Sequence, residues 1–250
     1  MPTILDLELQ CPLLHHGLVH LYPPEISAVY AACVALREAI ESDREWLDVH
    51  CRHVSPHSYG DLPAEINGYG SQFWYKDGEL HRAGDLPALI EADGSQEWYK
   101  EGKRHRAGDL PAVIWSDGSR YWYKYGRFHR EGDLPAWIWV DGTQKWFKEG
   151  KLHRDGDLPA EIWANGTQYW FKNGTKHRDG DLPAEICASS TQCWYQDGKK
   201  HRDGDLPAEI WANGSQMWYK YGKLHRDGDL PAVIREDGTR RWYKEGFVTE

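Results

Sequence analysis

The chain has 250 residues, of which 28% are charged and 40% hydrophobic, and its formal net charge is −9. Eight acidic residues and three arginines give residues 1–56 a charge of −5, and the remaining 31 acids and 27 bases give −4. Neither part is basic, so we expect no nucleic-acid partner and no polybasic membrane anchor. Fourteen Trp and fourteen Tyr supply enough apolar surface for an ordered core, which argues against a disordered chain.

The five cysteines have no spacing typical of a disulfide framework, and one of them would remain unpaired. Near the start of the chain, Asp6 and Glu8 stand where a secretory signal would have basic residues and then an apolar run. No run reaches the roughly 20 apolar residues of a membrane span. We therefore expect a soluble intracellular protein, located in the cytoplasm.

Residues 1–56 have a pattern of their own. Thr3 to Leu9 includes alternating apolar and acidic residues, which is typical of a short half-buried strand. After Pro23 and Pro24, apolar residues recur at spacings of three and four, which predicts an amphipathic helix over about 25–50. Two interpretations stay open: the segment caps the repeats that follow, or its helix dimerises or binds a partner.

Residues 57–248 consist of eight repeats of 24 residues with no insertion or deletion. The pentad Gly-Asp-Leu-Pro-Ala begins first at Gly60 and last at Gly228, and each repeat has a Trp followed by Tyr or Phe. A fixed short period of this kind indicates stacked structural repeats. We expect two positions of each copy to form the repeat core: Trp74, Trp98, Trp122, Trp146, Trp170, Trp194, Trp218 and Trp242, with Ile66, Ile90, Ile114, Ile138, Ile162, Ile186, Ile210 and Ile234.

A turn signal such as Asp-Gly or Asn-Gly follows the isoleucine in most copies and predicts a hairpin. A two-residue loop would put the Ile and Trp of one repeat on opposite faces. In the seventh repeat, a three-residue loop at 212–214 instead pairs Ile210 with Gln216. The Ala, Ile, Gln and Trp positions that hardly vary then share one face, and variable positions such as Glu209 and Met217 share the other. We therefore predict a type I turn closed by a glycine bulge.

A second glycine turn follows the Trp strand, at Asp77-Gly78 in the first repeat, and a longer return leads to the Leu-Pro corner. Proline lacks a ladder donor, so we place this corner at the beginning or edge of a strand. We expect two short strands per repeat and, at about 4.8 Å per strand, a sheet roughly 75–80 Å long. The predicted fold class is mainly β: an elongated antiparallel β-hairpin array with an α-helical N-terminal cap.

The order Trp-Tyr-Lys-Asp-Gly-Lys-Leu-His-Arg-Asp-Gly, then a strand and Asp-Gly-Ser, resembles MORN repeats over residues 57–248. The chain departs from that pattern at Arg82, Arg106 and Arg202, which stand where the family has its second glycine, and the Asp-Leu-Pro-Ala corner lengthens the return. The resemblance implies an elongated antiparallel sheet of stacked hairpins. It also implies a scaffold for other proteins, with lipid binding proposed for some members of the family.

A histidine opens every repeat, and seven of the eight are followed by Arg. Neighbouring copies lie roughly 10 Å apart, whereas His ligands sit about 2 Å from a metal, so these histidines cannot share one ion. We expect His, Arg and the next Asp to bond one another and the backbone at the corner. The alternative is a pH-sensitive ladder of charges.

Other candidate reactive groups have simpler interpretations. His50, Cys51, His53 and His57 form a cluster, but their spacing matches no zinc pattern. Cys187 and Cys193 occupy positions that hold other residue types, such as Trp or Met, elsewhere, and we interpret them as small apolar fillers rather than a redox pair. The chain has no recognisable nucleophile, phosphate-binding or paired-carboxylate motif. We predict no catalytic residue, no metal and no cofactor.

The variable face is the best candidate for a functional surface. Exposed aromatic anchors are typical of protein-binding sites. The alternative is that this face is a second packed layer or is covered by the N-terminal segment. We predict a non-enzymatic scaffold that binds another protein or itself, with a membrane-associated phospholipid adaptor, a viral structural protein and an enzyme or metal protein built on the N-terminal segment as alternatives. The candidate residues are Trp115, Trp137, Trp139, Trp163 and Trp211, with Tyr121 and Tyr169.

Overall fold

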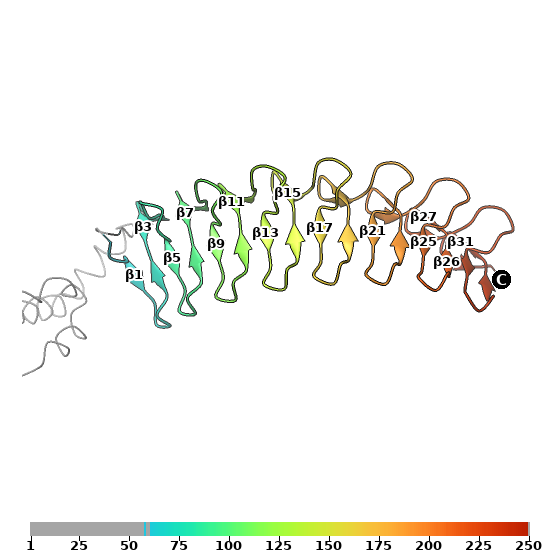
Figure 1. Cartoon of the computed structure of the whole chain (residues 1–250), viewed down its shortest axis with the longest axis horizontal. Coiled ribbons are helices and arrows are strands. Elements are labelled where there is room, and N and C mark those ends of the chain that lie inside the picture. The colour runs from blue at the N-terminus through green and yellow to red at the C-terminus, as the bar shows by residue number, and fades with distance from the viewer. Residues whose placement is uncertain (1–57, 59–60, 250) are drawn as a thin grey trace, which may run out of the picture. The chain divides into compact units, whose positions relative to one another are not determined.

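A computed structural model of the chain describes residue 58 and residues 61–249. The strand predicted at 3–9, the helix predicted at 25–50 and the histidine cluster at 50–57 lie outside these residues. Within 61–249 every regular element is a β-strand. The fold there is a regular array of antiparallel hairpins in a long open sheet, as the 24-residue period predicted (Figure 1).

Each repeat contributes two strands to a main sheet of 16 strands, and neighbouring strands follow one another in chain order. Every strand is only two residues long, so its ladder supplies few hydrogen bonds. The strands of the main sheet are β1 (Glu65–Ile66), β2 (Gln72–Phe73), β5 (Leu89–Ile90), β6 (Gln96–Glu97), β9 (Val113–Ile114), β10 (Arg120–Tyr121), β13 (Trp137–Ile138), β14 (Gln144–Lys145), β17 (Glu161–Ile162), β18 (Gln168–Tyr169), β21 (Glu185–Ile186), β22 (Gln192–Cys193), β25 (Glu209–Ile210), β26 (Gln216–Met217), β29 (Val233–Ile234) and β30 (Arg240–Arg241).

The predicted register of the first hairpin is confirmed. Ile210 of β25 lies opposite Gln216 of β26. The amide of Gly214 donates to the carbonyl of Trp211, and the amide of Trp211 donates to the carbonyl of Ser215, both at 2.9 Å. Gly214 has φ +87°, a left-handed conformation that glycine adopts without strain. These bonds define a three-residue loop made of a type I turn and a glycine bulge.

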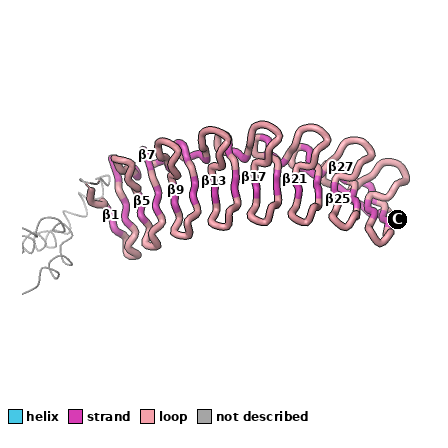
Figure 2. The backbone as a smooth tube through the Cα atoms, viewed as in Figure 1, coloured by secondary structure: helices cyan, strands magenta, loops and turns pink. Residues whose placement is uncertain are grey.

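The prediction of two strands per repeat was wrong, because the second glycine turn closes a second hairpin (Figure 2). Its two-residue loop has positive φ at both positions, for example +48° at Tyr221 and +89° at Gly222, which is a type I′ turn. The eight second hairpins pair β3 (Tyr75–Lys76) with β4 (Glu79–Leu80), β7 (Tyr99–Lys100) with β8 (Lys103–Arg104), β11 (Tyr123–Lys124) with β12 (Arg127–Phe128), β15 (Phe147–Lys148) with β16 (Lys151–Leu152), β19 (Phe171–Lys172) with β20 (Thr175–Lys176), β23 (Tyr195–Gln196) with β24 (Lys199–Lys200), β27 (Tyr219–Lys220) with β28 (Lys223–Leu224), and β31 (Tyr243–Lys244) with β32 (Phe247–Val248).

The core is a stack of tryptophans and alanines. From Trp74 to Trp218 the seven repeat tryptophans are 3–6% exposed, and the pentad alanines from Ala88 to Ala232 are fully buried. Trp242 of the last repeat is half-buried. The repeat isoleucines are half-buried as well, except Ile66 of the first repeat, which is 58% exposed.

An arginine holds each core tryptophan in place and joins two repeats. The guanidinium of Arg226 lies 3.9 Å from the ring centre of Trp218. It donates to both carboxylate oxygens of Asp205, at 2.6 and 2.7 Å, and to the carbonyl of Pro231 at 3.3 Å. Asp205 and Trp218 belong to one repeat, whereas Arg226 and Pro231 belong to the next. We call this arrangement the arginine clamp, and it recurs down the array.

The sixth repeat provides a test of the hairpin geometry, because Ser190 stands where the other copies have glycine and has φ +69°. We predict that Ser190→Gly raises the free energy of unfolding by about 1 kcal/mol, since an L-residue is strained in this region. Urea unfolding followed by circular dichroism measures the change. The control is Gly166→Ser at the same position of the fifth repeat, where a Cβ would meet no atom within 4 Å. It should lower stability by a similar amount, and equal midpoints for all three proteins would contradict the prediction.

Candidate functional site

The variable positions of neighbouring repeats meet in a layer between the main sheet and the second hairpins. The last strand residue of a second hairpin contacts the first strand residue of the next repeat. Lys200 binds Glu209 at 2.7 Å in this way. The equivalent positions at the junction of the third and fourth repeats hold an aromatic stack instead of an ion pair. There the ring centres of Phe128 and Trp137 lie 5.3 Å apart. We call this set of side chains the inner layer.

Carboxylates in the inner layer are buried and paired. Glu97 is 4% exposed and accepts hydrogen bonds from Arg104 at 2.7 Å and from the Tyr99 hydroxyl at 2.6 Å. Burial raises the pKa of Tyr99 to about 12, and the bond to Glu97 acts in the same direction. At Glu185, burial acts to raise the pKa, but the hydrogen bonds from Lys176 and Tyr195 and the charge of Lys176 together outweigh it and leave the pKa lowered. A buried carboxylate without its cation would be costly, so these pairs stabilise the packing.

Aromatic side chains fill the inner layer around the fourth repeat. Phe128 stacks on Phe147 with ring centres 4.6 Å apart as well as on Trp137. Trp139 meets Trp137 edge to face at 5.1 Å, and its indole nitrogen donates to the Tyr121 hydroxyl at 2.9 Å. Trp137, Trp139 and Tyr121 are half-buried. At these three candidate residues the variable face is therefore largely a second packed layer, which was the alternative interpretation.

The other candidate tryptophans remain accessible. Trp115 is 40% exposed, and Trp163 and Trp211 are each 43% exposed. All three stand directly after the isoleucine, as the last residue before the three-residue hairpin loop. The indole nitrogens of Trp163 and Trp211 each donate to the glutamate two residues earlier, at 2.5 and 2.9 Å. Tyr169 is half-buried with its ring centre 5.7 Å from that of Trp163.

A second exposed apolar row was not predicted from the sequence. The leucine of each Gly-Asp-Leu-Pro-Ala pentad is 40–46% exposed, although its identity never varies among the copies. Its occurrence in all eight repeats would ordinarily indicate a core residue. The flanking Asp and Pro, which place it at a corner, were the available signal for exposure. The row consists of Leu62, Leu86, Leu110, Leu134, Leu158, Leu182, Leu206 and Leu230.

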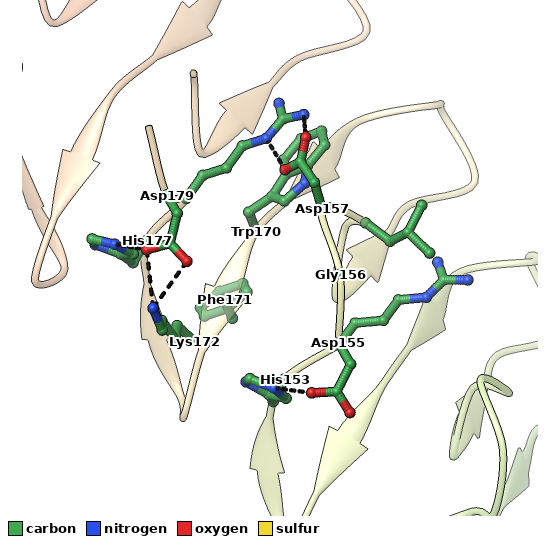
Figure 3. Close-up of a pocket in the computed structure, with 12 residues that line it drawn as sticks. His153, Asp155, Gly156, Asp157, Trp170, Phe171, Lys172, His177 and Asp179 are labelled. Atoms are coloured by element: carbon green, nitrogen blue, oxygen red, sulfur yellow. Dashed lines mark hydrogen bonds and ion pairs between the residues drawn. The ribbon is translucent and has the colours of Figure 1, made fainter. Parts of the chain in front are cut away.

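An open groove of about 300 Å³ lies at the corner between the fifth and sixth repeats (Figure 3). Similar grooves occur at the corners of other repeats. Each exposes the edge of an arginine clamp and two opening histidines. The groove of Figure 3 is lined by His153, Arg154, Asp155, Gly156, Asp157, Leu158, Trp170, Phe171, Lys172, His177, Arg178 and Asp179.

Charged groups in this groove are paired with one another. Arg178 donates to both oxygens of Asp157 at 2.6 and 2.8 Å. The hydrogen bond from Arg178 holds the pKa of Asp157 below its usual value. Asp179 accepts from Lys172 at 2.9 Å and contacts His177 at 3.0 Å, and these hydrogen bonds lower the pKa of Asp179 in the same way.

The opening histidines from His129 to His225 contact the next acidic residue, as predicted. Nδ1 of His153 accepts from the amide of Asn173 at 3.2 Å, which assigns the ring proton to Nε2. Nε2 lies 3.0 Å from Asp155 and donates to it. The second and third repeats have alanine at the acidic position, so their histidines lack this contact. Within the described part of the chain, no group of three or more His, Cys, Asp or Glu is arranged to hold a metal ion.

The two cysteines of the sixth repeat lie in the inner layer. Cys193 is 3% exposed, and burial raises the pKa of its thiol to about 12. Burial also raises the pKa of Cys187, which is half-buried. A thiol with a raised pKa is a weak nucleophile at neutral pH, which fits the interpretation of both residues as apolar fillers.

Comparison with known proteins gave no relative: no family model matches the chain, and no curated protein sequence is similar to it. Among the residues that the structure describes, none belongs to a helix with the length and hydropathy of a membrane span.

The arginine clamps should make the free energy of unfolding depend on pH. Their hydrogen bonds lower the pKa values of Asp85, Asp109, Asp133, Asp157, Asp181 and Asp205 in the folded protein. Their contribution is therefore complete above the unfolded pKa of about 3.9 and is lost as the pH falls through the folded values. We predict that the urea midpoint falls as the pH drops from 5 to 2.5.

The matched variant is Arg178→Gln, which removes one guanidinium and keeps the other clamps. Its fall in urea midpoint between pH 5 and 2.5 should be smaller than that of the unmodified chain. An unchanged midpoint over this range in the unmodified chain would contradict the role of the clamps.

Proposed function

We propose that the chain is a non-enzymatic intracellular scaffold that binds another protein, or a second copy of itself, along its extended face. The observation that carries the proposal is the exposure of Trp115, Trp163 and Trp211 at one equivalent position of the array. Tryptophans that expose two-fifths of their surface are uncommon on a monomer and are enriched among the residues that dominate binding energy.

The repeat architecture supports this function. An array whose repeats contact only their neighbours offers an extended surface with regularly spaced anchors. The charged side chains that line the corner grooves form ion pairs with one another. This pairing favours a binding function for the chain over a catalytic one.

We also propose that the array is a variant of the MORN repeat. The support is the stacked antiparallel hairpins at a 24-residue period, together with the order of aromatic, glycine and turn positions. The arginines that replace the second glycine of that family have a structural role in this chain. Arg106, for example, lies 3.8 Å from the ring centre of Trp98 and binds Asp85. A clamp of this kind explains why the pattern departs from the family at that position.

A membrane-associated adaptor ranks second. Binding to anionic headgroups requires cations that are free of nearby acids. In the grooves, Arg178 is bound to Asp157 and Lys172 to Asp179. This pairing leaves little unbalanced positive charge along the corners, and the whole chain has a net charge of −9.

The test of the scaffold function is the triple variant Trp115→Glu, Trp163→Glu and Trp211→Glu. Glutamate is compatible with this position, because Glu91 occupies it in the second repeat. We predict that the tagged variant retains its partner, or a second copy, at least about tenfold less than the unmodified chain, since truncating such anchors removes most binding energy. Affinity capture and light scattering coupled to size exclusion measure the two cases.

The control is the double variant Leu134→Gln and Leu158→Gln, which alters the other exposed row and should retain binding. Equal retention by all three proteins would contradict the proposal. Pelleting with anionic vesicles that is abolished by salt and unaffected by the tryptophan substitutions would instead favour the membrane adaptor.

A further inference from the structure

We propose that the exposed tryptophans Trp115, Trp163 and Trp211, together with the half-buried Trp139 at the same position, bind a proline-rich segment in the polyproline II conformation, with proline at every third residue. We call these four residues the loop tryptophans. This inference rests on the proposed scaffold function and names the chemistry of the partner. It follows from the spacing of the tryptophans, the state of their indole nitrogens and the charge of the loops beside them.

The spacing of the tryptophans matches one class of peptide. Each repeat adds two strands to the main sheet, so equivalent positions of neighbouring repeats lie about 9.6 Å apart. A polyproline II helix rises about 3.1 Å per residue and returns to the same face every three residues, or about 9.3 Å. An extended strand returns to one face about every 6.7 Å, and an α-helix does so after seven residues, or about 10.5 Å. Both match the interval of the loop tryptophans less closely than polyproline II does.

The loops that carry the tryptophans are tied to their neighbours. The residues that follow Trp115, Trp139 and Trp163 each donate their amide to a hydroxyl of the preceding repeat. Ser116 donates to Ser95 at 2.9 Å, Val140 to Ser119 at 3.1 Å, and Ala164 to Thr143 at 3.1 Å. These bonds fix the distance between successive loops, so the tryptophans recur at a constant interval.

Three of the four indole nitrogens already donate hydrogen bonds within the array. Trp139 donates to the Tyr121 hydroxyl, and Trp163 and Trp211 donate to inner-layer glutamates. The rings are thereby oriented, and the groups left for a partner are their apolar carbon surfaces. A pyrrolidine ring fits such a surface, and a polyproline II segment brings it at low entropic cost because it is already extended.

The charge of the loops gives the ligand a direction. The turn residue two positions after the tryptophan position is acidic at Asp93, Asp117 and Asp141, and it is neutral at Asn165 and Asn213. The three aspartates are exposed. Lys145, the cation nearest Trp139 at 5.2 Å, is paired with Glu161. A ligand with Arg or Lys at one end would therefore place that end beside the second to fourth repeats.

The length of the ligand follows from the interruption at Cys187. Trp115, Trp139 and Trp163 are consecutive, whereas the sixth repeat has the half-buried Cys187 at this position. Two repeats span about 19 Å, which is two turns of polyproline II. The shortest complete ligand is therefore seven residues, Pro-x-x-Pro-x-x-Pro. Trp211 is reached only by a ligand two turns longer.

The experiment uses the full chain and fluorescein-labelled peptides in anisotropy titrations. The probe has the core Pro-x-x-Pro-x-x-Pro with two arginines at one end. A second peptide has the same composition with proline at every fourth residue. The proteins are the unmodified chain, the double variant Trp115→Glu and Trp163→Glu, and the control Leu134→Gln and Leu158→Gln.

We expect the every-third-residue peptide to bind the unmodified chain and the leucine control equally. The same peptide should bind at least tenfold more weakly to the tryptophan variant. It should also bind at least tenfold more weakly to a triple variant in which Asn replaces Asp93, Asp117 and Asp141. The every-fourth-residue peptide should bind the unmodified chain at least tenfold more weakly than the first peptide does. Circular dichroism of each protein checks that the array remains folded.

Equal binding of the two peptides would overturn the spacing argument. Tryptophan-dependent binding of a β-linked oligosaccharide, with none of either peptide, would show that the rings stack on sugars instead. If no peptide binds while the tryptophan substitutions still abolish partner or second-copy retention, the scaffold function stands and the proline-rich ligand is wrong. If those substitutions change neither measurement, both proposals fail.

Discussion

The arginine clamp is the contact on which the array depends. Strands of two residues form too few ladder hydrogen bonds to hold a sheet of 16 strands by themselves. The clamp adds a cation over an indole, a bidentate ion pair and a bond to a backbone carbonyl, and it draws these groups from two successive repeats. Because the stability of a repeat array is close to a sum of repeat and interface contributions, a contact that recurs at six successive interfaces, from Arg106 to Arg226, counts many times.

The clamp also explains why other positions can vary. The clamp residues and the buried Trp and Ala positions fix the backbone of each repeat. The inner layer therefore only has to fill its space and balance its charges. The chain fills it in two ways: with ion pairs such as Lys200 and Glu209, or with stacks such as Phe128 on Trp137. In the copy where Leu152 takes the position of Lys200, Glu161 is paired with Lys145 instead. A buried carboxylate of the layer thus keeps a cation beside it, as a buried charge must.

Much of the fold could be predicted from the sequence, because eight copies reveal which positions share a face. The hairpin register followed from that comparison, and the pairing of Ile210 with Gln216 confirms it. The glycine turn of the second hairpin was recognised, but the strands on either side of it were missed because two residues are too few to show an alternating pattern. Tyr125 has a left-handed conformation in this turn, and its strain is offset by stacking on His105 at 4.3 Å, a contact within the third repeat between residues 20 positions apart.

The exposed tryptophans could be named from the sequence, but their division into anchors and packing residues could not. Trp139 and Trp163 occupy the same position, yet Trp139 is half-buried because Trp137 and Tyr121 lie beside it. In the fifth repeat Glu161 takes the place of Trp137, and Trp163 stays 43% exposed. Exposure at the loop thus depends on which residue fills the inner layer two positions earlier. The variable face is one coupled system, in which the packing beneath the loops sets how much of each anchor remains free to bind.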